Sequence, residues 1–408
     1  MELRPILSTL RRHKTASALI VLEIALSCAI ICNAMFLIGG RLERMDRPTG
    51  QAEDELVRIQ ITGIGQDDNA AALTASDLAA LRALPGVKSA SVTNQLTFGG
   101  SSWNSGVNLT QEQTQVNLSS STYLGDEKLP ETLGLQLVAG RFFTADEMVD
   151  WDAFSAPGAN LAVPVSIITR DMAEALWPGE DPLGKTYYSW GEGGTRVVGV
   201  VDKLARPNEM GGPAQYYYSS ILPLRIPFNV GGNYVLRVDP ERRAETLEAA
   251  EQALLRNGPN RIILEKQTLE EMRSDYYRQD RAMSWMLVIV SVLLLVVTAL
   301  GIVGLASFWV AQRTKQIGVR RALGATRGQV LRYFQLENFV LATAGIVLGM
   351  MLAYGLNQLM MERAELPRLP AIYLPVGALV LWLLGQLSVF GPARRAAAVP
   401  PAVATRSV

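Results

Sequence analysis

Residues 179–186 carry the most specific chemical pattern in this 408-residue sequence, because GEDPLGKT fits the phosphate-binding motif G-x-x-x-x-G-K-[ST]. Such a loop follows a buried strand and opens a helix, whose backbone N–H groups hold the phosphate. Here a helix-like run, 171–177, comes first, and Pro182 lacks an N–H donor. Glu180 and Asp181 would also repel phosphate. We therefore interpret 179–186 as a structural turn.

Other reactive side chains are few. The single histidine, His13, excludes a histidine-based catalytic site in the body of the protein. The two cysteines, Cys28 and Cys32, exclude a disulfide framework and a four-cysteine zinc site. The acidic pairs 67–68 and 126–127 are expected to be solvated loop charges rather than metal ligands. We predict no catalytic residue, cofactor or metal on this chain, and therefore not an enzyme.

Four stretches are long and apolar enough to cross a membrane, since a span needs about 20 residues. They are 16–40, 283–310, 339–361 and 372–390. The first is interpreted as a retained anchor rather than a cleaved signal peptide, because its apolar core exceeds the roughly 15 residues of a signal sequence and no A-x-A site follows.

Glu23 is an ionisable residue within the first span, where a charge is costly and usually faces protein or water. Three roles remain open from the sequence. The carboxylate could lie between helices, lie shallow enough to reach the membrane surface, or couple to an ion.

The distribution of charge predicts the orientation of the spans. Three segments are basic: the one before the first span, the one from span two up to Glu337, and the one after span four. Together they hold 13 basic residues and one acid, whereas 41–282 holds 23 basic and 33 acidic residues. Basic loops stay in the cytosol. We therefore predict that both termini are cytosolic and that 41–282 lies outside. The overall charge of zero gives no sign of a nucleic-acid partner.

The outer segment is predicted to be an α/β domain in which two βαβ units form a split arrangement. Its predicted strands and helices are Leu56–Thr62, Thr74–Leu84 (capped by Thr74 or Ser76), Val87–Thr93, Tyr234–Val238, Pro240–Asn257 and Arg261–Lys266. Residues 98–232 are predicted to form an inserted β-rich subdomain. Residues 41–47 and 268–281 extend the spans as a stalk, with ordinary helix ends as the alternative.

The cytosolic segments contain two candidate docking elements. Residues 1–15 are predicted to form an amphipathic helix at the membrane surface. Residues 311–338 are predicted to hold a short helix that ends near Gly324 and a second helix that begins at Thr326 with a capping box. Residues 391–408 form a cytosolic tail.

The 312–349 segment resembles the hallmark region of MacB/FtsX-type ABC transporter permeases, roughly R-T-x-E-I-G-[IV]-R-x-A-L-G-A-[ST]. This chain reads RTKQIGVRRALGAT from Arg313, with Gln316 where the family usually has Glu. Three further segments resemble family motifs: GLQLVAGRFF from Gly134, LWPGEDPLGK from Leu176 and PARRAAAVP from Pro392. The second of these accounts for the pattern at 179–186.

The resemblance implies a fold and a function. The fold is an α+β membrane protein with four transmembrane helices and a large periplasmic α/β domain between the first two, in the bacterial inner membrane. The function is that of a permease subunit that transmits the movement of a separate cytosolic ATPase to the periplasmic domain and so drives export. ATP and magnesium would bind the ATPase.

The implied partners are the ATPase, a second permease protomer, and a periplasmic adaptor with an outer-membrane channel. An ATPase-coupled regulator of a periplasmic protein, such as a cell-wall hydrolase, or a lipoprotein-handling permease is the alternative function. We predict that the short cytosolic helix contacts the ATPase, with Ile317 and Leu323 in a groove. The predicted coupling residues are Ile317, Gly318, Arg320, Arg321, Leu323 and Gly324.

Overall fold

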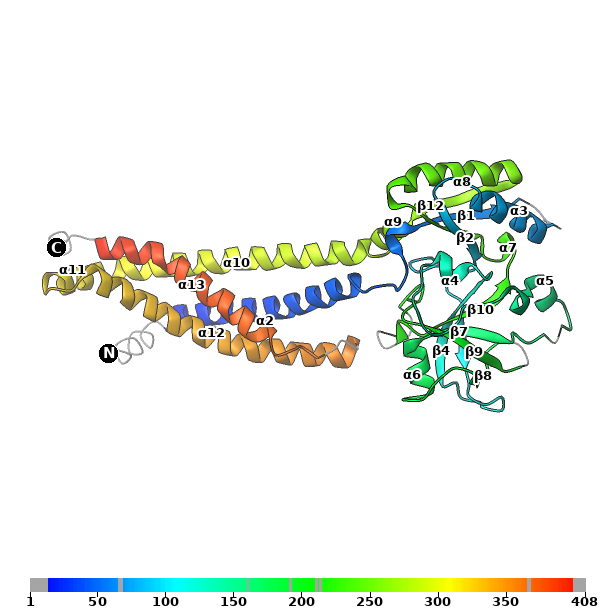
Figure 1. The fold of residues 1–408 in the computed structure, drawn as a ribbon. Coiled ribbons are helices and arrows are strands. Elements are labelled where there is room, and N and C mark those ends of the chain that lie inside the picture. Colours follow the sequence, from blue (N-terminus) through cyan, green and yellow to red (C-terminus); the bar gives the residue numbers. More distant parts are fainter. Residues whose placement is uncertain are drawn as a thin grey trace. The chain divides into compact units, whose positions relative to one another are not determined.

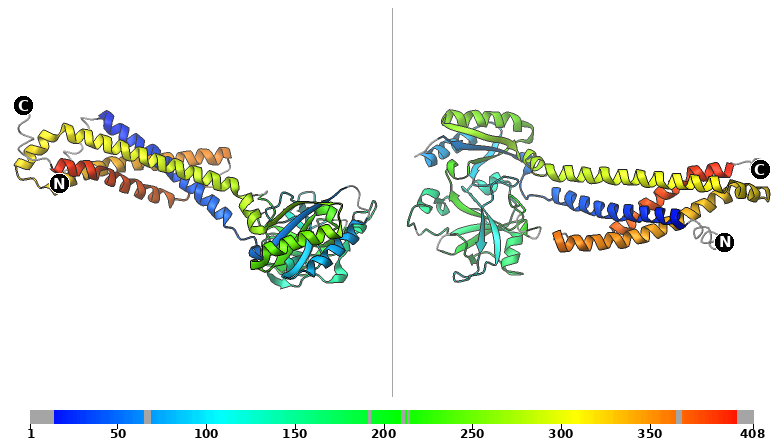
Figure 2. Two further views of the ribbon diagram at one scale, coloured as in Figure 1. Left: turned by 90° about the horizontal axis from the view of Figure 1, so that it is seen from above. Right: turned by 180° about the vertical axis from the view of Figure 1, so that it is seen from behind.

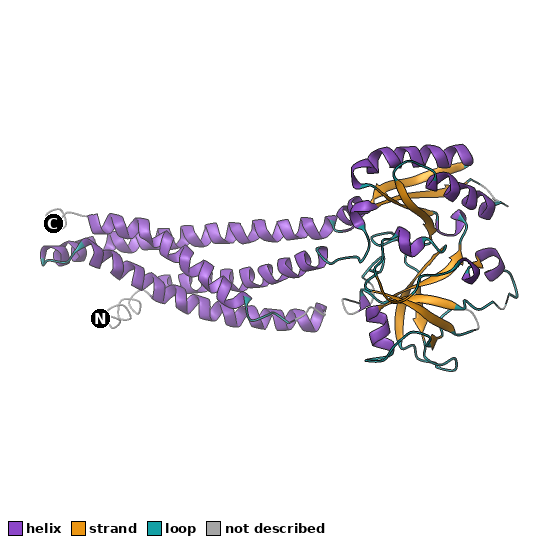
Figure 3. Ribbon diagram, viewed as in Figure 1, coloured by secondary structure: helices purple, strands orange, loops and turns teal. Residues whose placement is uncertain are grey.

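The computed structural model describes residues 14–64, 69–159, 161–190, 193–209, 212, 215–364 and 368–398 (Figure 1). The chain divides into two compact units, which we call the globular unit (47–278) and the membrane unit (the segments on either side). All described strands lie in the globular unit, whereas the membrane unit is helical (Figure 3). The amphipathic helix predicted at 1–15 lies outside the described residues, except for Lys14 and Thr15.

Four helices of the membrane unit are long and apolar enough to cross a membrane, and they lie alongside one another (Figure 2). They are α2 (Lys14–Met45), α10 (Arg278–Gln312), α12 (Arg327–Ala364) and α13 (Tyr373–Ala398). Helices α2, α10 and α12 extend beyond the predicted apolar stretches at both ends, because polar residues continue the helices there. Helix α13 begins one residue inside its predicted stretch and extends beyond it only at the C-terminal end. Helix α12 begins at Arg327 and thus includes the second part of the predicted cytosolic segment 311–338.

Glycines allow α2 to pack closely on α12 and α13. A Cβ atom at Gly345 of α12 would lie 2.8 Å from the Ile24 Cβ atom, and one at Gly349 would lie 2.5 Å from the Cys28 Cβ atom. Gly377 of α13 makes similar room for the Cys32 sulfur. Small residues let membrane helices approach each other in this way. The two cysteines are buried in the resulting core.

Helix α10 is joined to α2 by polar contacts. The hydroxyls of Ser27 and Thr298 are 2.8 Å apart, and Arg44 binds Asp280 at 2.9 Å near the end of α2. Few residues of α10 are buried, namely Ser284, Thr298, Ile302, Ala306 and Trp309. The apolar remainder of α10 is therefore open to lipid or to another chain.

The small sheet of the globular unit has the strand order β12-β1-β11-β2, with all neighbours antiparallel. Its elements are β1 (Leu56–Gly63), α3 (Ala70–Arg82), β2 (Val87–Thr93), β11 (Asn233–Val238), α8 (Arg243–Asn257) and β12 (Arg261–Thr268). A strand of the other βαβ unit lies between the two strands of each βαβ unit. The predicted split arrangement is therefore confirmed.

The inserted part between β2 and β11 forms a mixed sheet in the order β3-β4-β10-β7-β9-β5, to which β6 and β8 add at β10 and β9. Its strands are β3 (Asn104–Val107), β4 (Leu118–Gly125), β5 (Leu137–Gly140), β6 (Val149–Asp150), β7 (Val165–Thr169), β8 (Thr186–Tyr187), β9 (Thr195–Val201) and β10 (Ser219–Arg225). The prediction of a β-rich insertion is confirmed. Three short helices lie within this inserted part: α4 (Leu129–Thr132), α5 (Trp151–Phe154) and α6 (Arg170–Leu176). Helix α7 (Phe228–Gly231) leads from β10 to β11, and α9 (Leu269–Tyr276) follows β12.

The predicted cap of the first helix of the globular unit is wrong. Helix α3 begins after Asn69, and Thr74 lies inside it, where its hydroxyl donates to the Ala70 carbonyl and accepts from the Phe228 N–H. The helix predicted at 268–281 is present as α9 and the start of α10, with a break at Tyr277.

Candidate coupling site

The short helix α11 (Thr314–Ala322) lies between the ends of α10 and α12 in the membrane unit. Gly324 ends it with a positive φ of 98°. The Gly324 N–H donates to the Arg321 carbonyl at 3.1 Å and the Ala325 N–H donates to the Arg320 carbonyl at 3.0 Å, which is the Schellman pattern of helix termination.

The next helix begins at once. The Thr326 N–H donates to the Gln329 side chain at 2.9 Å, and the Gln329 N–H donates to the Thr326 hydroxyl at 3.3 Å. This is the predicted capping box. The two caps fix the turn between α11 and α12 within a few residues, so α11 is a defined element rather than a loop.

A buried ion pair fixes the start of α11. Arg313, the one residue between α10 and α11, donates to both carboxylate oxygens of Glu337 at 3.1 and 2.9 Å. Both side chains are largely buried, and the Arg313 guanidinium lies 5.8 Å over the ring of Trp309. Removing one partner of a buried pair leaves the other charge uncompensated, which is strongly destabilising. The pair therefore holds the α10–α11 junction to α12.

Sequence reasoning missed this pairing. The available signal was that Glu337 is the only acid between residues 311 and 361. The partner could not be chosen among six basic residues without knowing how α11 folds back on α12.

The predicted role of Ile317 in contacting a partner is corrected by its position. Ile317 is only 6% exposed and belongs to the core of the membrane unit, together with Val330 and Phe334 of α12. Gly318 beside it is buried too. Both residues hold α11 against its own chain and leave no surface for a partner.

Polar residues near the start of α11, Lys315 and Gln316, are exposed, and the exposed apolar side chains lie further along. Leu323 is 83% exposed and Val319 is exposed as well. Arg320 lies 5.4 Å over the Tyr333 ring, and Arg321 donates to the Ala397 carbonyl at 3.0 Å, which ties α11 to α13. Of the predicted coupling residues, Leu323, Gly324 and Arg320 thus share the accessible side.

Glu23 lies on α2 against Gly301 of α10. A Cβ atom at Gly301 would lie 2.5 Å from the Glu23 Oε2 atom, so only glycine leaves room for the carboxylate. The Ser27–Thr298 hydrogen bond lies one turn further along the same two helices. Of the roles that the sequence left open for Glu23, this position corresponds to a contact between helices.

The region of residues 179–186 has the predicted local structure. Helix α6 comes before it and strand β8 begins at its end, which is the reverse of the order in a phosphate-binding loop. Lys185 pairs with Glu180 and lies 5.5 Å over the Trp177 ring. Lys185 is therefore held within the turn.

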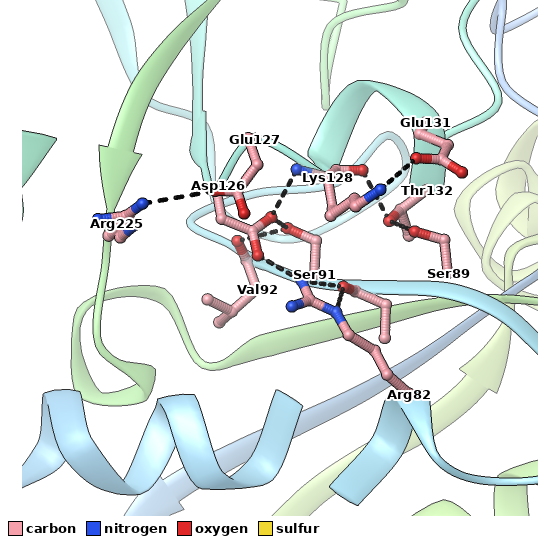
Figure 4. Close-up of polar contacts among 11 residues, drawn as sticks. Arg82, Ser89, Ser91, Val92, Asp126, Glu127, Lys128, Glu131, Thr132 and Arg225 are labelled. Atoms are coloured by element: carbon pink, nitrogen blue, oxygen red, sulfur yellow. Dashed lines mark hydrogen bonds and ion pairs between the residues drawn. The ribbon is translucent and has the colours of Figure 1, made fainter. Parts of the chain in front are cut away.

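The prediction that Asp126 is a solvated charge is wrong. Asp126 lies between β4 and α4 and is only 6% exposed. It accepts hydrogen bonds from Ser91 of β2 at 2.6 Å and from Arg82 of α3 at 2.5 Å (Figure 4). Burial raises the pKa of the Asp126 carboxyl, and the Ser91 hydroxyl and the Arg82 charge oppose the rise.

Asp126 therefore joins the two sheets of the globular unit. Its neighbour Glu127 lies 3.7 Å from Arg225 of β10, and Ser89 and Thr132 share a second hydrogen bond of 2.7 Å between β2 and α4 (Figure 4). Within the described part of the chain, no group of three or more His, Cys, Asp or Glu residues could hold a metal ion. The pair 67–68 lies outside the described residues.

Two family models match the sequence. The MacB-like periplasmic core domain matches residues 17–254, which is more than half of the chain, and the FtsX-like permease C-terminal model matches residues 288–401. The chain belongs to the MacB/FtsX family of ABC transporter permeases. The resemblance seen in the sequence motifs is confirmed.

Individual relatives match over most of the permease. It is 23% identical over 415 residues to the uncharacterized ABC transporter permease YknZ of Bacillus subtilis strain 168, covering 99% of this chain and 98% of YknZ. It is 24% identical over 423 residues to the macrolide export ATP-binding/permease protein MacB of Bordetella avium strain 197N. That match covers 98% of this chain and 59% of MacB, so the permease spans little more than half of that relative.

A solved structure is also similar. The extracellular domain of a YknZ transporter from Gram-positive bacteria matches with 17% identity and a TM-score of 0.32, covering 51% of this chain and 100% of that domain.

Proposed function

We propose that this permease is the membrane subunit of an ATP-driven exporter and that a separate cytosolic ATPase binds the exposed end of α11. The observation that carries the proposal is Leu323, a large apolar side chain at 83% exposure that follows α11 three residues after Arg320, whose guanidinium lies over the Tyr333 ring. An apolar anchor in a pocket, surrounded by weaker polar pairs, is the usual energetic pattern of a protein interface.

The same geometry supports mechanical transmission. Helix α11 is tied to α12 by the Arg313–Glu337 pair and to α13 by the Arg321–Ala397 hydrogen bond. Only Arg313 separates α11 from α10, and only Tyr277 separates the other end of α10 from α9 of the globular unit. A displacement of α11 by the ATPase would therefore reach the globular unit along α10.

The family supports export as the output. Relatives are named for macrolide export and for pyoverdine export, and the large periplasmic-type domain distinguishes this chain from a permease with a small outer domain. We propose that two permease protomers and two ATPase subunits assemble in the inner membrane, with ATP and magnesium bound by the ATPase. A periplasmic adaptor and an outer-membrane channel would complete the export path.

The exposed apolar residues of α10 support the presence of a second protomer in the complex. Side chains such as Leu293 and Leu300 could lie against another copy as well as against lipid.

The test replaces Leu323 by Asp in the full-length chain. The charge would be buried without a partner in the ATPase groove, at a cost of several kcal/mol, so the ATPase should no longer co-purify and transport should be lost. Membrane insertion should be unchanged, because the side chain touches little of its own chain.

Leu255→Asp is the matched control, since Leu255 is an exposed leucine on α8 of the globular unit. Retained ATPase and transport in Leu323→Asp would refute this docking surface. A wild-type chain that co-purifies no ATPase, yet acts on a periplasmic protein, would favour a regulatory function instead.

A further inference from the structure

A small cavity lies inside the membrane unit where α2, α10, α12 and α13 meet. It leaves about 10 Å³ for the centre of a water molecule, which is close to the minimum that holds one water. All of its lining residues are buried: Ile20, Ile302, Ala306, Trp309, Phe334, Glu337, Asn338 and Val389.

Two donors in this lining have no acceptor among the described residues. They are Nε1 of Trp309, a side chain at 5% exposure, and Nδ2 of Asn338, at 6% exposure. A buried donor without a partner costs the full desolvation of the group, and the cost is greatest where no bulk water can reach it. Both residues line the same cavity, so an acceptor inside it is the candidate partner for both donors.

The third polar group in the lining is an acceptor. Glu337 contributes its carboxylate, which already accepts from Arg313. The charge of Glu337 is therefore balanced, which disfavours a cation, and a small anion would be repelled by the carboxylate. A ligand at this position must accept two hydrogen bonds and can donate to Glu337, and a water molecule has these properties.

We propose that the cavity binds a water molecule that accepts from Trp309 and Asn338 and donates to Glu337. The water would join α10 to α12 one turn before the Arg313–Glu337 pair, at the junction of α10 and α11. A bridging water is nearly as favourable in enthalpy as a direct hydrogen bond. It would let α10 change its position on α12 during coupling, and this consequence rests on the proposed function.

Double substitution tests the water site without any ATPase. In the purified full-length permease, Asn338→Leu keeps the side-chain shape and removes the amide, and Trp309→Phe removes the other donor. A bridging water predicts that each variant melts a few degrees lower, about 2–4 °C, and that the double variant loses clearly less than the sum.

A dry cavity predicts the opposite sign. Asn338→Leu would then remove an unsatisfied donor and raise the melting temperature. Raised melting temperatures, or fully additive losses, would overturn the proposal.

Asn357→Leu is the matched control. Asn357 is a buried asparagine on α12 whose side-chain oxygen accepts from the Leu369 N–H. It lies 19 residues along the helix from Asn338, about 28 Å, so its effect should add to that of Trp309→Phe.

Hydroxyl-radical labelling gives a second readout, because radicals formed from bound water modify the side chains beside it. Trp309 should be modified despite its burial, and more than Trp382, whose N–H donates to Thr343 at 3.1 Å. An unmodified Trp309 would refute a bound water.

The functional consequence has its own measurement. Asn338→Leu should leave the ATPase bound, because Asn338 is remote from the exposed side of α11, and should lower transport-coupled ATP hydrolysis severalfold. Unchanged coupled hydrolysis would refute the role in coupling. A wild-type permease without any bound ATPase would instead refute the proposed function and leave the melting test of the water site standing.

Discussion

The globular unit and the membrane unit each contain a buried arginine–carboxylate pair, Arg261–Asp77 and Arg313–Glu337, and the surroundings of these two pairs differ. In the globular unit, Asp77 accepts from Arg261, from the Tyr234 hydroxyl at 2.6 Å and from Asn257 at 3.2 Å. Arg261 also donates to the Leu254 carbonyl at 2.5 Å. This pair is surrounded by protein partners and locks α3, α8, β11 and β12 together.

The pair of the membrane unit has different surroundings. One Arg313 nitrogen serves both oxygens of Glu337, and the neighbouring donors of Trp309 and Asn338 have no acceptor among the described residues. A fully satisfied network of buried polar groups rigidifies a structure. The comparison indicates that the Arg261–Asp77 pair is held by protein groups, whereas the donors beside the Arg313–Glu337 pair depend on the proposed water.

The largest loss of stability is expected when the Arg261–Asp77 pair of the globular unit is broken. Asp77→Ala would leave Arg261 buried without a carboxylate and the Tyr234 hydroxyl without its acceptor, at a cost of about 3–5 kcal/mol. Thermal unfolding of the purified protein should show loss of the globular unit. The control is Glu245→Ala, which removes an exposed ion pair with Arg242 and should change nothing measurable. A small effect of Asp77→Ala would remove the distinction between the two pairs.

A smaller loss of stability is expected when the Arg313–Glu337 pair of the membrane unit is broken. Glu337→Ala should cost about 3 kcal/mol, the low end of the range for breaking a buried pair, because Arg313 lies at a helix end and retains some exposure. Coupled ATP hydrolysis should fall more steeply than the melting temperature. If coupled ATP hydrolysis fell only as far as the loss of folded protein explains, Glu337 would serve stability alone.

The smallest expected effect on stability concerns Asp126, whose hydrogen bonds link the two sheets of the globular unit. Because burial raises the pKa of Asp126, the contribution of this carboxyl to stability is fully present below its unfolded pKa and is lost as the pH rises through the folded value. Asp126→Asn keeps an acceptor for Ser91 and does not titrate. We therefore expect the melting temperature of wild type to fall relative to Asp126→Asn from about pH 4 upward. A difference that stays constant with pH would contradict the raised pKa.

The sequence was sufficient where the controlling interactions are local or periodic. The four apolar stretches, the alternation in β1 and the capping box at Thr326 each predict what the structure shows. The split βαβ arrangement followed from two similar patterns far apart in the sequence.

The failures share a physical cause, since each depends on a partner distant in sequence. Asp126 looked solvated because Ser91 and Arg82 are more than 30 residues away. Ile317 looked like an exposed anchor because its contacts with Val330 and Phe334 require α11 to fold back on α12.

Cross-linking from position 323 tests the central claim most directly. A cysteine at Leu323 can be treated with a thiol-reactive photo-cross-linker in membranes that contain the whole complex, while the native cysteines Cys28 and Cys32 are buried and should not react. The same treatment of a cysteine at Leu255 is the control. The account predicts a permease–ATPase adduct from position 323 and none from position 255. An ATPase that co-purifies with the permease but forms no adduct from position 323 would contradict docking at α11.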